Sequence, residues 1–248
     1  MDEKITIETL KKPEFLESAK KQLEDFLNYN SGKEARDFVY DLEKVLRGNP
    51  DFETSSPDLF NEYQNIIIKM KLVALPFLKD EEIIAALKDH FSIMLLSFPP
   101  VTNDIVDKLT AHLVGIPLYE ERDTLKGKIR EILFESQEKI TTNGIKDENG
   151  IEQPPTISNW IKNYLNEVKG AEEDSLKQTM YLYNARTKMN LSDKEQEAVK
   201  MLLTLYEFLG RSSLTMEGLE ESVLIDDNGV LKILDHGNLE VIGPAGEE

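Results

Sequence analysis

The sequence predicts an all-α protein, a multi-helix bundle with a small C-terminal β-hairpin. Three observations carry this prediction. Apolar residues recur at helical spacing along most of the chain, and proline, glycine or capping residues stand at the ends of these segments. Only near the C-terminus does the pattern change to short apolar runs around an Asn-Gly turn. Hydrophobic residues make up 40% of the 248 residues, enough for a sizeable core.

The sequence of the N-terminal part predicts two helices after a loosely ordered first segment. Residues 1–12 are expected to be irregular, with a short extended piece at Ile5–Ile7. Because a short turn joins the next two amphipathic segments, they are expected to pack as an antiparallel hairpin. Their apolar stripes are Phe15, Leu16, Ala19, Leu23, Phe26 and Leu27, followed by Ala35, Phe38, Val39, Leu42, Val45 and Leu46. Residues 49–56 are expected to form a loop.

The next helix is expected to lie at the centre of the bundle. Ser56 is its predicted cap and Pro57 lies in its first turn. It is apolar on more than one side, and it should end near Leu75, because Pro76 lacks a backbone N–H and disfavours helix in the residue before it.

Two copies of one pattern follow, each starting at a proline. The five matched positions that follow each proline lie 22 residues apart along the chain. The copies read Pro76, Ile83, Ile84, Leu87, His90, Phe91 and Pro99, Ile105, Val106, Leu109, His112, Leu113. A weaker third stripe follows Pro117. One interpretation is a helical-hairpin repeat; the other is two neighbouring bundle helices of similar sequence.

Residues 143–155 interrupt the helical pattern with two Asn-Gly turns and Pro154-Pro155. They predict a linker or a short hairpin, and with it a domain division. The expected parts are an N-terminal helical bundle at 1–142, this connection, and a C-terminal helical unit with the β-hairpin and an acidic tail at 156–248.

The C-terminal unit is predicted to hold three or four helices. Trp160, Ile161 and Tyr164 lie in the stripe of the first, whereas Leu176, Met180 and Tyr183 mark the second. Ser192 and Glu195 form a capping box at the start of the third, which should stop at Gly210. Residues 222–225 and 230–234 then read as strands around Asn228-Gly229, and residues 239–242 as a further strand.

Composition narrows the class of protein. The net charge is −18, which disfavours binding to nucleic acid. No apolar run is long enough to span a membrane, and no signal peptide is recognised. The chain has no cysteine, which excludes disulfides and thiolate sites and suits a reducing compartment. We therefore expect a soluble, cytoplasmic protein.

The sequence contains few groups that could carry catalysis. Its three histidines are His90, His112 and His236, and none belongs to a known metal-binding motif. His90 and His112 occupy matched positions in the two copies, so a metal site at these two residues is one hypothesis and two half-buried structural histidines are the other. Phosphate-binding glycine loops and nucleophile elbows are missing. No cofactor is predicted.

The leading hypothesis is a non-enzymatic protein–protein interaction module, an adaptor or regulatory subunit whose partner is another, possibly basic, protein. Aromatic residues dominate interface energies, so the candidate partner-binding residues are Trp160, Tyr164, Tyr181 and Tyr183. Trp160 and Tyr164 also fit a core position, whereas Tyr181 and Tyr183 lie on different sides of their helix and are expected nearer the surface. The alternatives are a carboxylate- or metal-dependent enzyme and an acidic mimic of nucleic acid.

Overall fold

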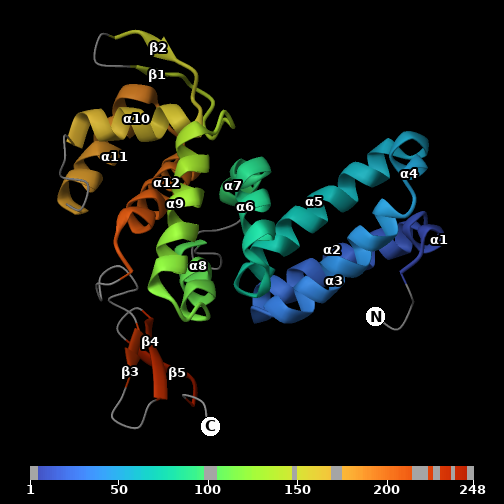
Figure 1. Cartoon of the computed structure of the whole chain (residues 1–248). Coiled ribbons are helices and arrows are strands. Elements are labelled where there is room, and N and C mark those ends of the chain that lie inside the picture. The colour runs from blue at the N-terminus through green and yellow to red at the C-terminus, as the bar shows by residue number, and fades with distance from the viewer. Residues whose placement is uncertain are drawn as a thin grey trace.

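A computed structural model of the chain describes residues 5–97, 105–146, 150–168, 175–213, 223–225, 230–235 and 238–244. Within these residues it contains twelve α-helices, one 3-10 helix and two small antiparallel sheets (Figure 1). The predicted fold class, an all-α bundle with a small C-terminal β unit, is confirmed.

The elements of the N-terminal half are all helical. They are α1 (Ile7–Leu10), α2 (Pro13–Tyr29), α3 (Gly32–Arg47), α4 (Asp51–Ser55), α5 (Pro57–Ala74), the 3-10 helix η1 (Leu75–Phe77), α6 (Asp80–Asp89), α7 (Phe91–Ser97) and α8 (Ile105–Val114). The C-terminal half continues with α9 (Tyr119–Glu135), β1 (Ile145–Lys146), β2 (Glu152–Gln153), α10 (Ile157–Val168), α11 (Ser175–Met189), α12 (Asp193–Gly210), β3 (Val223–Ile225), β4 (Val230–Asp235) and β5 (Asn238–Pro244).

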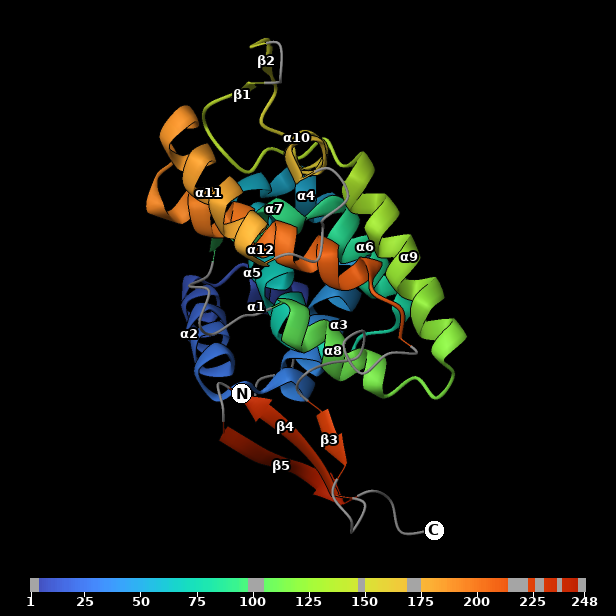
Figure 2. The same ribbon diagram turned by 90° about the vertical axis from the view of Figure 1, so that its left-hand side faces the viewer.

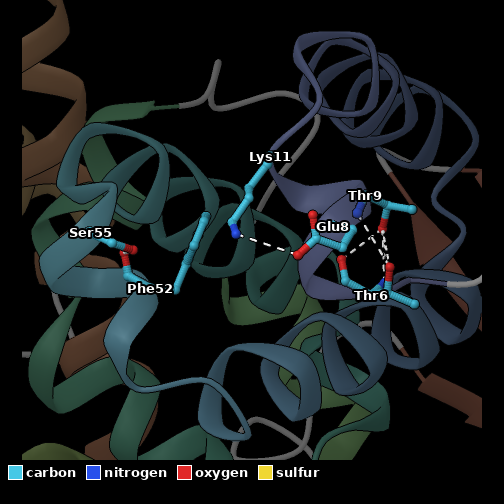
Figure 3. A network of polar contacts seen from close by, with 6 residues as sticks. All are labelled: Thr6, Glu8, Thr9, Lys11, Phe52 and Ser55. Atoms are coloured by element: carbon cyan, nitrogen blue, oxygen red, sulfur yellow. Dashed lines mark hydrogen bonds and ion pairs between the residues drawn. The ribbon is translucent and has the colours of Figure 1, made fainter.

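Residues 5–12 are more ordered than the sequence predicts. The Thr9 backbone N–H donates to the Thr6 hydroxyl at 3.3 Å, and the Thr6 N–H donates to the Thr9 hydroxyl at 2.8 Å (Figure 3). This reciprocal capping box starts α1, and the complete burial of Leu10 holds it against the bundle. The predicted extended segment at Ile5–Ile7 is therefore wrong at Ile7, which is the first residue of α1.

The predicted loop at residues 49–56 also contains a short helix, α4. Its Phe52 side chain is buried in the core, and the Ser56 N–H donates to the Phe52 carbonyl at 2.9 Å. Burial of one aromatic side chain is a tertiary contact that local turn chemistry does not reveal. The loop assignment was wrong for this reason.

The helix α5 has the central position that the sequence predicts for it. It packs against α2, α3, α4 and α7, and Figures 1 and 2 show it among the helices of the N-terminal half. Its buried residues cover more than one side and are Tyr63, Ile66, Ile67, Ile68, Met70, Leu72, Val73 and Ala74. The helix tightens into η1 around Pro76, close to the predicted end at Leu75.

The two copies of the proline-led pattern differ in local structure. In the first copy α6 ends at Asp89, and His90 lies outside the helix with φ −143° and ψ 16°. Phe91 then starts the separate helix α7. In the second copy His112 lies inside α8, while residues 98–104, including Pro99, lie outside the described residues. The helical-hairpin repeat stays a prediction.

The helix α12 contacts helices of both halves of the chain. It packs against α7, α8, α9, α10 and α11. The buried apolar side chains of the described residues form one cluster that runs from Leu10 to Leu209. The connection at residues 143–155 contains the antiparallel pair β1–β2, so the short hairpin is observed there; the division into two domains stays a prediction.

The C-terminal β unit is a three-stranded antiparallel sheet with the order β3-β4-β5. Leu224 pairs with Lys232, and Ile233 pairs with Glu240. In both views the sheet lies at the end of the molecule opposite β1 and β2 (Figures 1 and 2). The predicted hairpin and third strand are confirmed, while the Asn228-Gly229 turn and His236 lie outside the described residues.

Candidate functional site

The helix α10 starts where the chain returns from the β1–β2 hairpin. The Asn159 N–H donates to the Thr156 hydroxyl at 3.2 Å, which caps the first turn. Trp160 is completely buried, and its indole Nε1–H donates to the Thr141 hydroxyl at 3.2 Å. Trp160 therefore holds α10 on the preceding connection and is enclosed by the protein itself.

Two tyrosines and a glutamate lie together between α10, α11 and α12. The rings of Tyr164 and Tyr181 meet edge to face, with centroids 5.1 Å apart. The Tyr164 hydroxyl hydrogen-bonds to the Glu207 carboxylate, and the Gln178 amide donates to the same carboxylate at 3.1 Å. The cluster thus contains a polar group from each of the three helices and fixes them against one another.

Tyr181 is held on its polar side as well. Its hydroxyl donates to Asn163 Oδ1 at 2.8 Å, and the Asn163 amide donates to the Lys146 carbonyl at 3.2 Å. Burial, with a smaller contribution from Glu167, raises the pKa of the Tyr181 hydroxyl well above its ordinary value. The hydroxyl therefore stays neutral and donates.

Three of the four predicted partner-binding residues belong to this core. Trp160 and Tyr164 are fully buried, the position that their helical spacing also fits. The surface position expected for Tyr181 is wrong, since only 3% of the residue is exposed. Its ring fills the space between α10 and α11, a contact that the sequence of α11 alone does not specify. Tyr183 is 71% exposed, as expected.

The helix α11 has apolar residues on two opposite sides. Its buried side faces α10 and α12 and consists of Tyr181, Leu182, Ala185 and Met189. Leu176, Met180 and Tyr183 follow one another at i, i+4 and i+7 and are 66%, 57% and 71% exposed. At about 100° per residue these three share one face, opposite the buried one. We call Leu176, Met180 and Tyr183 the α11 stripe.

The orientation of α11 corrects the sequence interpretation. The sequence marks this helix by Leu176, Met180 and Tyr183 and expects Tyr181 and Tyr183 nearer the surface; in the structure Leu176, Met180 and Tyr183 face outward and Tyr181 is buried. The second row on α11 is equally regular, and only the neighbouring helices decide which row is buried. Leu176 and Met180 are therefore surface residues that sequence reasoning missed; the available signal was the presence of two apolar rows on one helix.

The charges of α11 are of one sign. Acids outnumber bases 47 to 29 in the whole chain, yet α11 contains Lys177, Arg186 and Lys188 and no acidic residue. Arg186 pairs with Asp193 at 2.6 Å, and Lys188 pairs with Glu167 at 3.2 Å. Both ion pairs are exposed, so each stabilises the protein by about 0–1 kcal/mol.

His90 and His112 make separate contacts within the bundle. His112 Nε2 lies 2.8 Å from Asp80 Oδ1, and its Nδ1 lies 3.4 Å from the Pro76 carbonyl oxygen. The ring therefore connects α8 to η1 and to the first turn of α6. The His90 backbone joins α6 to α7: its N–H donates to the Ala86 carbonyl and its carbonyl accepts from the Met94 N–H, each at 3.1 Å.

The described part of the chain brings no three potential metal ligands of the histidine, aspartate and glutamate types together. Among the same residues, no helix combines the length and the apolar character that crossing a bilayer requires.

A buried lysine lies on the other side of α12. Lys126 in α9 is fully buried, and its Nζ donates to the Arg211 carbonyl at 2.6 Å and lies 4.7 Å from the centre of the Phe208 ring. Burial lowers the pKa of Lys126, while the nearby Asp123 opposes this effect. Asp123 accepts from the Ser213 backbone N–H at 2.8 Å. These contacts tie α9 to the segment that follows α12.

No protein-family model, curated protein or solved structure matches this chain.

Proposed function

We propose that the chain is a non-enzymatic protein-interaction module, an adaptor or regulatory subunit, that docks a partner on the α11 stripe. The supporting observation is the position of Leu176, Met180 and Tyr183 opposite the buried side of their helix. Single exposed apolar residues are ordinary on a protein surface. Three that follow one another along one helix face form a continuous patch, and such patches are typical of interaction sites.

The packing beneath the stripe supports the same function. Tyr181 follows Met180 and precedes Tyr183 along the helix, but its side chain points to the buried side. Its ring and its hydroxyl both contact α10. The helix is thus fixed before a partner arrives. A rigid surface loses less conformational entropy on binding, which favours affinity.

The stripe also has the composition of a binding surface. Tyrosine supplies a large contact area with little rotamer entropy and is enriched among residues that dominate binding energy. Methionine adapts to the shape of a partner because its side chain is flexible and polarizable. Helix faces of this kind are recognised through anchors at i, i+4 and i+7.

A photocrosslinking experiment tests this function. A benzophenone amino acid replaces Tyr183 in the full chain, and a second variant has it at Tyr40, which is 66% exposed on α3. In cells that express the chain naturally, position 183 should crosslink one protein in near-stoichiometric yield, and position 40 should not. The crosslinked protein is identified by mass spectrometry and its binding to the chain is repeated with both proteins purified.

Four outcomes would contradict this function. Equal crosslinking at positions 40 and 183, or none at position 183, contradicts docking on the α11 stripe. Failure of the purified partner to bind, or binding that Met180→Asp leaves unchanged, does the same.

A further inference from the structure

We infer that the α11 stripe takes an acidic amphipathic helix of another protein. This inference rests on the proposed function and adds the chemistry of the partner. It depends on where the bases of α11 lie relative to its exposed apolar residues.

The three bases of α11 border the stripe on both edges. At about 100° per residue, Lys177 and Lys188 project from one edge of the exposed face, and Arg186 projects from the other. The stripe is therefore an apolar row between two positive edges. The complementary surface is an apolar row with carboxylates on both sides, which a helix provides with apolar residues at i, i+4 and i+7.

The existing ion pairs leave this complementarity in place. The side chains of Arg186 and Lys188 are 50% and 60% exposed in their pairs with Asp193 and Glu167. Exposed pairs of this kind are weak, so an incoming carboxylate can share or replace the present partner at little cost.

The same charges argue against two other occupants. If two copies of the chain paired through α11, each helix would bring Lys177, Arg186 and Lys188 against the same bases of the other, and like charges in contact are unfavourable. A flat anionic membrane would meet the field of the whole protein, whose net charge is −18. A single helix meets mainly the charges within a Debye length of about 8 Å, which are the three bases of α11 and the acids Asp193 and Glu167 that pair with two of them.

Two synthetic peptides of about 18 residues test the inference. Both have leucine at i, i+4, i+7 and i+11; the first has glutamate at the flanking positions and the second has lysine. Fluorescence anisotropy with the full-length chain should give saturable binding of the glutamate peptide, at least about tenfold tighter than binding of the lysine peptide. Added salt should weaken the binding of the glutamate peptide.

Three variants of the chain assign this binding to the surface. Met180→Asp should weaken the glutamate peptide about tenfold or more, because it places a charge in the apolar contact. The triple variant Lys177→Glu, Arg186→Glu, Lys188→Glu should reverse the preference between the peptides. Tyr40→Ser on α3 is the matched control and should bind as the original chain does.

Several results would overturn the inference. They are no saturable binding of the glutamate peptide, equal binding of both peptides, and binding that Met180→Asp does not affect. Concentration-dependent dimerisation that Met180→Asp abolishes would instead assign the stripe to a second copy. Binding to vesicles of phosphatidylserine and phosphatidylcholine that Met180→Asp abolishes would assign it to a membrane. If crosslinking at position 183 identifies a partner segment that is not acidic, the proposed function holds and this inference fails.

Discussion

The ring of Tyr164 in α10 meets the ring of Tyr181 in α11 edge to face, with 5.1 Å between their centroids and 69° between their planes. Edge-to-face pairs stabilise a protein by about 0.5–1.5 kcal/mol beyond the burial of their surface. This contact orients α11: it turns one apolar row inward and leaves Tyr183 outside. The candidate interaction surface therefore depends on a buried contact behind it.

Tyr164→Phe should destabilise the fold and leave the ring contact intact. The substitution removes the hydrogen bond to the Glu207 carboxylate, and a bond to a charged acceptor contributes about 1–3 kcal/mol. Urea denaturation should show a lower midpoint. Tyr183→Phe is the control on the exposed side of α11 and should change the free energy of unfolding by less than about 0.5 kcal/mol. Equal midpoints for the two variants would contradict the assigned role of the cluster.

Glu195→Gln should make the free energy of unfolding less dependent on pH in the acidic range. Burial by itself raises the pKa of the Glu195 carboxyl, but hydrogen bonds from Ser192 and from the Thr142 backbone outweigh it and lower this pKa from 4.5 to about 2. Since the folded-state pKa is depressed, the stabilisation is present above pH 4.5 and is lost as the pH falls toward 2.

The expected size of this effect is about 1–2 kcal/mol, because Glu195 is partly exposed and solvent screens its interactions. Denaturation curves at several acidic pH values measure it as the difference between the original chain and the variant. The exposed Glu131→Gln controls for the loss of one negative charge. A difference that stays constant over the whole acid range would show that the carboxylate of Glu195 is not responsible.

Tyr63→Phe should weaken the attachment of α1 and change how the free energy of unfolding depends on pH in the alkaline range. The Tyr63 hydroxyl donates to the Leu10 carbonyl at 3.0 Å in a fully buried position, so its loss should cost about 1–2 kcal/mol. Burial raises the pKa of Tyr63 from 10 to about 12. This raised value means that the stabilisation is complete below pH 10 and is lost as the pH rises toward 12.

Parallel unfolding measurements near neutral pH and at alkaline pH check this prediction. The stability difference between the original chain and Tyr63→Phe should shrink as the pH rises. If the difference grows instead, the hydroxyl does not titrate in the buried setting described here.

Two glycine-to-alanine substitutions should act in opposite directions. A Cβ at Gly32 would lie 2.7 Å from the Phe77 ring and 2.9 Å from the Val73 carbonyl oxygen, where η1 closes on α3. Gly32→Ala should therefore lower the free energy of unfolding by about 1–3 kcal/mol. A Cβ at Gly127, exposed within α9, meets nothing within 4 Å.

Gly127→Ala should raise stability by about 0.5–1 kcal/mol, since alanine loses less backbone entropy in a helix. Thermal or urea denaturation of both variants measures the contrast. Stabilisation by Gly32→Ala would mean that η1 and α3 are not in close contact.

Local signals located most of the helices correctly. The capping box of Ser192 and Glu195 starts α12, and Gly210 ends it. Pro57 lies in the first turn of α5, although the Ser56 side chain makes no capping hydrogen bond. These signals work because a cap or a proline acts on the backbone within a few residues of its own position.

The missed elements depend on distant residues. The short helices α1 and α4 are held by the burial of Leu10 and Phe52, and α6 ends at Asp89 although the apolar spacing continues through His90 and Phe91. Marginal helices of this length gain their stability from tertiary packing rather than from propensity. Their sequences alone therefore do not identify them.

The sequence by itself determined the helical class, the order of the long helices, the C-terminal β-hairpin and the strongly acidic surface. Periodicity, capping and net charge are properties of neighbouring residues or of composition, and they need no partner. Only the tertiary structure decided which apolar row of α11 is exposed. Tyr181 and Tyr183 belong to rows of similar hydrophobicity, and the free energy that buries one of them comes from α10 and α12.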